Sequence, residues 1–168
     1  MIRRQGLDYI WLFNGLGFEQ TNSTRTTAVT FGIFGDNIIP GAWEKAGITN
    51  PAVARLFNGT WFFFILESDG NIRSEVWGGN GDIPKPQDFD GDGLLDVAVF
   101  RPSTQETYAI LSSSGAALVL QFGSGTAEHT VRGDFTGDGI EEISTWEPSS
   151  GIYSSLLSDQ GFDTNAAE

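Results

Sequence analysis

Acidic side chains recur at alternate positions in two short stretches of the chain that lie 46 residues apart. The first reads Asp-Phe-Asp-Gly-Asp-Gly-Leu-Leu-Asp over residues 88–96, and the second reads Asp-Phe-Thr-Gly-Asp-Gly-Ile-Glu-Glu over residues 134–142. A hard cation such as calcium takes roughly six to eight oxygen ligands, and carboxylates at alternate positions of a loop can point to one centre. The two stretches therefore predict two calcium-binding loops.

The ligand positions match the first half of an EF-hand loop, in which alternate residues supply oxygens and a glycine allows a sharp turn. In the first loop the expected ligands are Asp88, Asp90, Asp92, the carbonyl group of Leu94, and Asp96. In the second loop they are Asp134, Thr136, Asp138, the carbonyl group of Ile140, and Glu142. The flanking residues read as strands rather than helices. Because the threonine removes one charge, we expect the second loop to bind calcium more weakly than the first.

The alternative interpretation is a metal-free Asp-Gly turn, which is a common feature of loops. Four carboxylates packed together without a cation would repel one another, and this favours a metal in the first loop in particular. Magnesium fits less well than calcium because it prefers to keep several waters. Two calcium ions would add four positive charges to a formal net charge of −13, so part of the acidity is explained as metal ligand.

Both loops belong to an internal repeat of 46 residues. A third copy of the loop, at residues 42–50, keeps its glycine at Gly47 but has lost two carboxylates, so we expect no metal there. The register extends beyond the loops, as shown by the equivalent residues Trp61, Thr107 and Tyr153. The dipeptide Gly35-Asp36 likewise matches Gly81-Asp82.

The repeat predicts an all-β fold. Twenty-two glycines suit short strands joined by tight turns, and no long segment has the spacing of an amphipathic helix. In the middle unit we expect strands at about residues 85–89, 96–101, 107–112 and 117–122. A four-stranded repeat of roughly 40–50 residues has the size of one β-propeller blade.

We expect one domain over residues 1–160 that contains about three and a half β-propeller-type four-stranded blades. Its parts are a partial blade at 1–35 with the last two strands of a unit, a degenerate blade at 36–81, a blade at 82–127, an incomplete three-stranded blade at 128–160, and a polar tail at 161–168. Closed propellers need at least about four blades, and open blades leave sheet edges that can pair with another chain. We therefore expect a homo-oligomer, in which two copies close a ring of about seven blades or copies join head to tail into a filament. A fragment of a longer array is the third alternative.

The stretch from Gly81 to Ser103 resembles the FG-GAP/VCBS repeats of integrin-like calcium-binding β-propellers, and the stretch from Tyr9 to Gly15 resembles the third strand and turn of the same repeats. In that family the acidic loop joins the first two strands of a blade and binds calcium, which implies the ten ligands named above. Members are mostly secreted or cell-surface proteins. The resemblance implies an extracellular calcium-binding repeat protein that acts in self-assembly or cell adhesion and that binds glycans or a cell-surface protein.

Two other functions stay open. The first is a calcium-dependent, lectin-like carbohydrate-binding module, with exposed aromatic rings as sugar platforms; the candidates are Trp43, Trp61, Trp77, Trp146 and Tyr153. Aromatic residues at fixed repeat positions are, however, more often core residues. The second is a non-catalytic part of a polysaccharide-degrading enzyme. The chain itself reads as a non-enzyme, since its single histidine, His129, is expected at the surface and no nucleophile elbow or phosphate-binding loop is found.

Charge and hydropathy restrict the partners. A net charge of −13 disfavours nucleic acid and anionic membranes. No apolar run approaches the roughly 20 residues of a membrane span, so we expect no membrane insertion. The chain has no cysteine, which excludes disulfides and thiolate metal sites. We expect a secreted or cell-surface protein, with a signal segment that is not seen in this chain.

Overall fold

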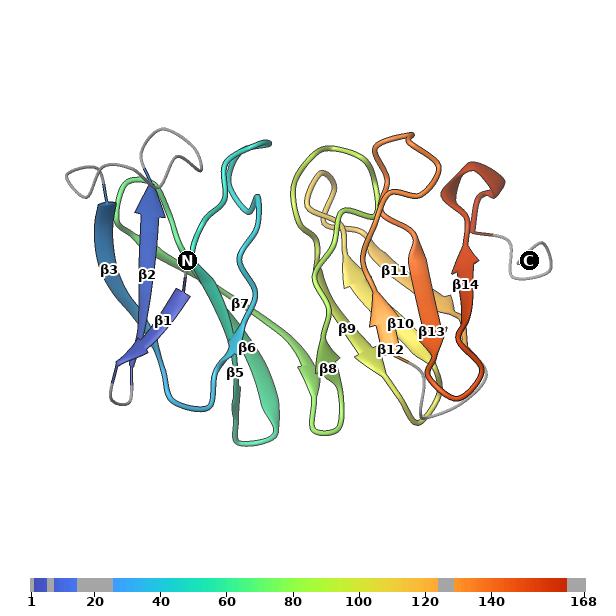
Figure 1. Ribbon diagram of the computed structural model, residues 1–168, viewed down its shortest axis with the longest axis horizontal. Coiled ribbons are helices and arrows are strands. Elements are labelled where there is room, and N and C mark those ends of the chain that lie inside the picture. The colour runs from blue at the N-terminus through green and yellow to red at the C-terminus, as the bar shows by residue number, and fades with distance from the viewer. Residues whose placement is uncertain (1, 6–7, 15–25, 124–128, 163–168) are drawn as a thin grey trace.

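The computed structural model describes residues 2–5, 8–14, 26–123 and 129–162, with side chains over residues 29–123 and 132–162. These residues form four antiparallel sheets, one short 3-10 turn at Ser158–Gln160, and no α-helix (Figure 1). The expected all-β class is confirmed. No described segment forms an apolar helix of the length needed to cross a membrane. Most of the expected polar tail, residues 163–168, lies outside the described residues.

Each sheet is built from strands that are consecutive in the chain and that pair in chain order. The first sheet contains β1 (Ile2–Gln5), β2 (Asp8–Asn14) and β3 (Thr26–Ile33). The second contains β4 (Asn37–Ile38), β5 (Ala52–Phe57), β6 (Thr60–Leu66) and β7 (Ile72–Gly79). The third contains β8 (Ile83–Pro84), β9 (Val97–Arg101), β10 (Glu106–Ile110) and β11 (Ala117–Gln121). The fourth contains β12 (His129–Val131), β13 (Ile143–Glu147) and β14 (Ile152–Leu156).

Strand bounds follow the 46-residue offset of the sequence. Strand β7 begins and ends 46 residues after β3, and strands β6, β10 and β14 begin at residues 60, 106 and 152. The three strands expected at the C-terminal end are present. At the N-terminal end two strands were expected, but the sheet has three, because residues 2–5 pair with β2. No sheet closes on itself within the described part of the chain.

The first strand of the middle unit differs from the expectation. It was expected at residues 85–89, but the regular pairing is confined to Ile83 and Pro84. Proline lacks the N–H that a sheet ladder needs, and Pro84 and Pro86 both stand in this segment. Beyond Pro84, the Lys85 N–H donates to the Ala98 carbonyl of β9 at 2.8 Å, and Gln87 forms an isolated bridge with Asp96, just before β9.

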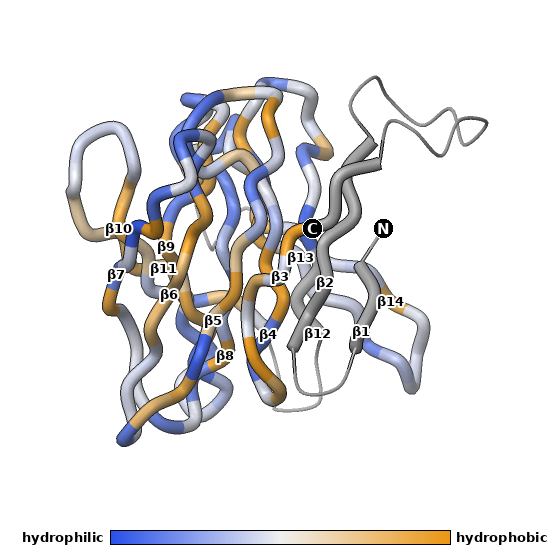
Figure 2. The backbone as a smooth tube through the Cα atoms, turned by 90° about the vertical axis from the view of Figure 1, so that its left-hand side faces the viewer, coloured by the Kyte–Doolittle hydropathy of each residue, from blue (hydrophilic) through white to orange (hydrophobic). Residues whose placement is uncertain are grey.

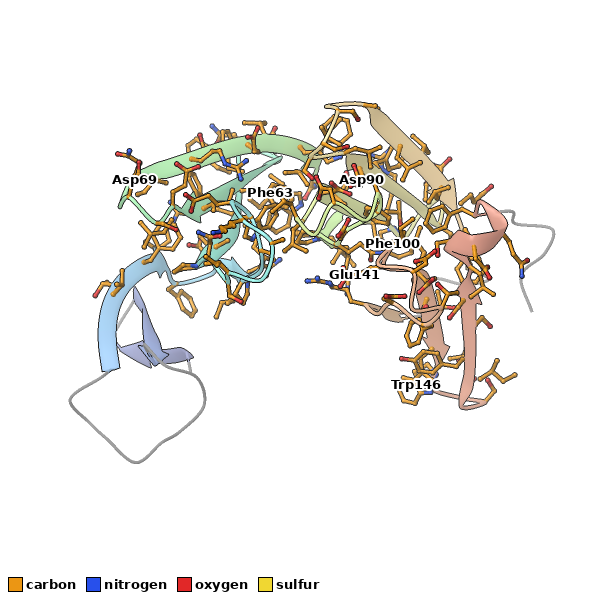
Figure 3. The ribbon with its side chains drawn as sticks, turned by 90° about the horizontal axis from the view of Figure 1, so that it is seen from above. Phe63, Asp69, Asp90, Phe100, Glu141 and Trp146 are labelled. Atoms are coloured by element: carbon orange, nitrogen blue, oxygen red, sulfur yellow. The ribbon has the colours of Figure 1, made fainter. Side chains whose placement is uncertain are left out.

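The sheets pack face to face in chain order, and a hydrophobic cluster fills each contact. Strand β6 shows the cause, because Trp61, Phe63 and Ile65 are buried on one face and alternate with residues on the other face. The first face packs against Val97 and Val99 of the third sheet. Figure 2 shows hydrophobic stretches along the strands of the second and third sheets. Seen from above, the four sheets form an arc (Figure 3).

Two ion pairs, each between a buried aspartate and a partly exposed arginine, also repeat with the same offset. Arg55 Nε lies 2.7 Å from Asp36 Oδ1, and Arg101 Nε lies 2.8 Å from Asp82 Oδ1. The two aspartate side chains are 1% and 2% exposed. Each aspartate also accepts a hydrogen bond from a backbone N–H three residues earlier in the chain. These pairs hold the turn between two sheets to the second strand of the following sheet.

Candidate metal centre

Each acidic loop joins the first two strands of its sheet and is shaped by its first aspartate and its glycines. The Asp88 carboxylate accepts hydrogen bonds from the N–H groups of Gly91 and Gly93 at 2.7 and 2.8 Å. Gly93 has a φ of +83°, a conformation that strains residues with a side chain. In the second loop Asp134 accepts from Gly137 and Gly139 in the same way. The shared Asp-x-x-Gly-x-Gly spacing therefore gives both loops the same turn.

Three carboxylates converge in the first loop. Asp88, Asp90 and Asp96 each place an oxygen so that all three atoms lie within 4.8 Å of one another, and we call them the first acidic site. The Asp96 side chain is fully buried, where its oxygens accept the N–H groups of Phe89 and Ser112. Burial raises the pKa of Asp96 to about 6 and also raises the pKa of Asp88. Burial without a cation therefore disfavours the ionised form of both groups.

The fourth expected carboxylate of this loop, Asp92, has partners of its own. Asp92 Oδ1 accepts the N–H of Leu94 at 2.7 Å, and Asp92 Oδ2 accepts the hydroxyl of Ser112 at 2.8 Å. Asp92 is not part of the converging cluster. The structure thus brings together three of the four carboxylates predicted for the first loop.

In the second loop the three predicted carboxylates, Asp134, Asp138 and Glu142, converge within the same 4.8 Å, and we call them the second acidic site. Glu142 is fully buried. Its Oε1 accepts the hydroxyl groups of Thr136 and Ser158, each at 2.8 Å. Hydrogen bonds from the Ile140 N–H and the Ser158 hydroxyl lower the pKa of Asp138. The second site therefore takes its middle carboxylate from position 5 of the loop, whereas the first takes it from position 3.

In the degenerate loop at 42–50, the Glu44 carboxylate is held by hydrogen bonds from within the loop and from the turn between β6 and β7. The Glu44 carboxylate accepts the N–H of Ser68 at 2.9 Å, the hydroxyl of Ser68 at 2.7 Å, and the side-chain amide of Asn50 at 3.1 Å. These donors lower the pKa of Glu44, with the Ser68 hydroxyl as the largest cause. Hydrogen-bond donors of Ser68 and Asn50 thus stabilise the Glu44 carboxylate in the way that a cation would.

The loops lie side by side and are joined by backbone hydrogen bonds. The Leu95 N–H donates to the Ala42 carbonyl, and the Glu141 N–H donates to the Asp88 carbonyl, each at 2.7 Å. The Glu141 carboxylate also accepts the Asp88 N–H and forms an ion pair with Arg132. Asp88 is therefore both a member of the first acidic site and a direct neighbour of the second loop.

Serine hydroxyls from the β10–β11 turn and from the 3-10 turn after β14 contact carboxylates of both acidic loops. Ser112 and Ser113 donate to Asp92 and Asp90, and the single hydroxyl proton of Ser158 is shared between Asp138 and Glu142. We did not predict these residues from the sequence. The signal was available, because Ser112 and Ser158 are separated by 46 residues.

Among the side chains that the structure describes, no arginine forms an ion pair with a carboxylate of either acidic site. The ion pairs among the described residues are formed with other carboxylates, namely Asp36, Glu67, Glu75, Asp82 and Glu141. The buried members, Asp96 and Glu142, therefore keep backbone and hydroxyl donors as their described partners.

The aromatic residues considered as sugar platforms divide into two groups. Trp43 and Trp61 are buried, at 4% and 9% exposure, whereas Trp146 and Tyr153 are 39% and 53% exposed. Trp77 is half-buried and lines a cleft of about 470 Å³ between the second and third sheets. Trp43 and the charged residues Glu44, Glu67, Arg73 and Glu75 also line this cleft.

No family model, curated protein or solved structure matches the chain. Function is therefore inferred from its own residues and their arrangement.

Proposed function

We propose that this chain is a calcium-binding β-propeller-type repeat protein, in which calcium stabilises the acidic loops and the repeats build a self-assembling or adhesive structure outside the cell. The observation that carries the proposal is the convergence of three carboxylates in each of two loops that share one turn geometry and one 46-residue offset. The role is non-catalytic, with a second copy, a glycan or a cell-surface protein as partner.

Calcium fits the donors of both sites. Each site offers oxygen atoms alone, which suit a hard cation, whereas softer metals prefer nitrogen or sulfur. Asp96 and Glu142 are fully buried, and an ionised carboxylate in that position is costly unless a cation or hydrogen bonds compensate it. The first acidic site would hold the ion with Asp88, Asp90 and Asp96. Asp92 and the Leu94 carbonyl are further candidate ligands.

The second site would hold an ion with Asp134, Asp138 and Glu142. Thr136 and the Ile140 carbonyl are its further candidate ligands. Neither loop has the bidentate glutamate that closes a complete EF-hand site. Binding in the weak range of extracellular modules, with dissociation constants of roughly 0.1–1 mM, is therefore expected, and this supports placement outside the cell.

The sheet architecture supports the repeat part of the proposal. The second and third sheets each have four strands in chain order, as a propeller blade has, and each acidic loop joins the first two strands of its sheet. The end sheets have three strands each. We therefore retain the proposal of an incomplete ring of about three and a half blades that is completed by self-association.

Thermal unfolding with and without calcium tests the metal proposal. At a free calcium concentration of 100 times the dissociation constant, native-state binding adds about 2.7 kcal/mol of stability for one site. For a chain of this length, this free energy corresponds to a rise in Tm of about 5–11 °C. We expect calcium to raise the Tm of the wild type, chelation to lower it, and magnesium to have a smaller effect.

Two variants make the test specific. Asp90→Ala removes a carboxylate of the first acidic site and should lose a large part of the calcium-dependent shift. Asp69→Ala is the matched control. The Asp69 carboxylate accepts the N–H of Asn71, as the Asp90 carboxylate accepts the N–H of Asp92, but Asp69 lies in the turn between β6 and β7. This variant should keep the full shift. A wild type whose Tm is the same in calcium and in chelator would overturn the metal proposal.

Carbohydrate binding is a second candidate function, and the cleft lined by Trp43 and Trp77 favours it. Its volume of about 470 Å³ lies within the range of ligand pockets, and it combines aromatic rings with carboxylates and one arginine. Binding to a glycan array that is lost in Trp77→Ala would support this candidate. An array without a specific signal for the folded wild type in calcium would remove it.

A further inference from the structure

The cleft of about 470 Å³ between the second and third sheets has two walls of different chemistry, and we call it the inter-sheet cleft. The wall from the third sheet is mainly aliphatic, with Leu95, Val97, Ile110 and Leu111. The wall from the second sheet contains Trp77 and all of the charged residues that line the cleft. One cleft thus combines an extended apolar surface with a charged one.

The charged wall is net negative. It contains the carboxylates of Glu44, Glu67 and Glu75 and the guanidinium of Arg73, which leaves a formal charge of −2. The formal net charge of the whole chain, −13, adds a negative potential around the cleft. These charges disfavour an anionic ligand and favour a cationic one.

The one arginine of the cleft is engaged within the protein. Its Nε donates to Glu67 at 3.2 Å, and its Nη1 donates to Glu75 at 3.0 Å. Its Nη2 donates to the Trp43 carbonyl at 2.9 Å. All three nitrogens of the Arg73 guanidinium therefore have a partner, and the arginine holds the charged wall together.

The other side-chain donors of the cleft also have acceptors within the protein. The indole N–H groups of Trp43 and Trp77 donate to backbone carbonyls at 2.9 and 3.0 Å. The Ser112 hydroxyl donates to the Asp92 carboxylate at 2.8 Å. The tryptophans therefore present ring surface to a ligand rather than a free N–H group.

Acceptor oxygens, by contrast, remain. In Glu67 and Glu75 the Arg73 guanidinium binds Oε1, and in Glu44 all three hydrogen bonds go to Oε2. None of the described residues donates to the second oxygen of these carboxylates. The side chains of Glu67 and Glu75 are 25% and 45% exposed, so a ligand can reach them. The cleft therefore fits a ligand that donates hydrogen bonds and carries a positive charge.

We propose that the inter-sheet cleft binds a lysine or arginine side chain of a partner protein, with its cationic group at the glutamates and its stem along Trp77 and the aliphatic wall. The inference rests on the part of the proposed function that gives the chain a protein partner, and it names the chemistry of that partner. Ammonium and guanidinium groups donate hydrogen bonds and accept none. Their long stems pack on apolar surface, and a cation over an indole ring is attracted to it. A neutral sugar matches the cleft less well, because its hydroxyl groups both donate and accept.

Nuclear magnetic resonance titration of the isotope-labelled chain with the peptide acetyl-Gly-Lys-Gly-amide, at a fixed calcium concentration, tests the proposal. The indole N–H signal of Trp77 should shift, whereas that of Trp146, which lies in the last sheet, should stay in place. Acetylating the lysine side chain removes its charge and keeps its stem, so the acetylated peptide should bind at least about tenfold more weakly. Equal binding of the two peptides would overturn the proposal.

Two double variants of equal net charge locate the binding site. Glu67→Gln/Glu75→Gln removes two carboxylates of the cleft and should weaken binding of the lysine peptide at least about tenfold. Glu106→Gln/Glu147→Gln is the matched control, because it removes two hydrogen-bonded carboxylates at the ends of β10 and β13, outside the cleft. The control should bind the peptide like the wild type. An equal loss in both variants would show that the peptide responds only to overall charge, and this would overturn the site.

A third variant tests the cleft without removing any of its hydrogen bonds. Val76 lines the cleft and is 54% exposed. Val76→Lys places an ammonium group beside the same glutamates and should block the lysine peptide, while the circular dichroism spectrum stays that of the wild type. A folded Val76→Lys variant that binds the peptide as tightly as the wild type would contradict the proposal.

A glucosamine oligosaccharide offers an ammonium group on a sugar and so separates the two kinds of partner. Binding of this oligosaccharide at Trp77 that is tighter than binding of the peptides would overturn the protein partner. A folded wild type with a calcium-dependent Tm that binds neither the lysine peptide nor its arginine analogue would overturn the cleft proposal alone. Peptide binding at Trp77 in a chain whose Tm is the same in calcium and in chelator would support the cleft and overturn the metal proposal.

Discussion

Replacing Arg101 with methionine should lower the Tm more than replacing its partner Asp82 with asparagine. In the folded protein the Asp82 carboxylate is 2% exposed, whereas the Arg101 side chain is 38% exposed. Without the arginine, a carboxylate shielded from water keeps the Gly79 N–H as its described donor. Without the carboxylate, the guanidinium can still be hydrated. Because the carboxylate is less exposed than the guanidinium, losing the arginine should destabilise the fold more than losing the aspartate charge.

The size of each effect follows from the contacts. Removing one partner of a buried pair costs roughly 3–5 kcal/mol, and the partial exposure of Arg101 places this case at the lower end, at about 3 kcal/mol. The methionine variant also lacks the cation–π contact of the guanidinium with the Tyr108 ring, whose centroid lies 4.4 Å from Arg101 Cζ. Asparagine at position 82 keeps one acceptor oxygen and should cost about 1–2 kcal/mol. At about 2–4 °C per kcal/mol, the Tm should fall by about 6–12 °C for Arg101→Met and about 2–8 °C for Asp82→Asn.

Differential scanning calorimetry at pH 7 measures both effects, and the chain contains its own replicate. Asp36 and Arg55 form the same pair 46 residues earlier, with side chains 1% and 32% exposed. Arg55→Met should therefore also cost more than Asp36→Asn. A greater loss for the aspartate variant than for the arginine variant in both pairs would refute the reasoning from exposure.

Three further predictions concern the acidic sites and pH. In calorimetric calcium titrations, Asp90→Asn should weaken calcium binding about tenfold or more, and Asp92→Asn should weaken it less. The reason is that Asp90, unlike Asp92, lies in the converging cluster of the first acidic site. Equal effects of the two variants would contradict this assignment. Thr136→Asp should tighten the second site, since calcium affinity of such loops rises with ligand charge, and an unchanged affinity would contradict its position as a ligand. The hydrogen bonds from Arg101 are the main cause that holds the pKa of Asp82 below its usual value. The stability that the ion pair contributes is therefore fully present above the usual aspartate pKa, and it is lost as pH falls through the lowered pKa of Asp82. The Tm difference between wild type and Arg101→Met should therefore shrink in acid, and a difference that grows as pH falls would contradict this sign.

Regular features of the sequence predicted the strands well. Trp61, Phe63 and Ile65 alternate with residues of the opposite face, as in a strand with one buried face, and β6 is such a strand, with a partly buried second face. Strand bounds at equivalent positions keep the offset that the glycines and aromatics show in the sequence. Local patterns of this kind depend on residues close in the chain, which is why one sequence was sufficient to predict them.

Contacts between distant residues were harder to predict. Local spacing marked Asp92 as a candidate ligand equal to Asp90, but the Ser112 hydroxyl, which comes from the next hairpin, binds the Asp92 carboxylate. The pairing of Asp82 with Arg101 joins residues 19 apart, and it was missed although both residues have equivalents at Asp36 and Arg55. The signal for such pairs lies in the repeat, because Asp36 and Asp82 are 46 residues apart, as are Arg55 and Arg101.

Isothermal titration of the purified chain with calcium, after treatment with chelator, tests the central claim most directly. The account predicts two ions per chain with unequal affinities. The tighter should be lost in Asp96→Ala and the weaker in Glu142→Ala, because these are the fully buried carboxylates of the two sites. A folded wild-type chain that binds no calcium at millimolar concentration would contradict the claim.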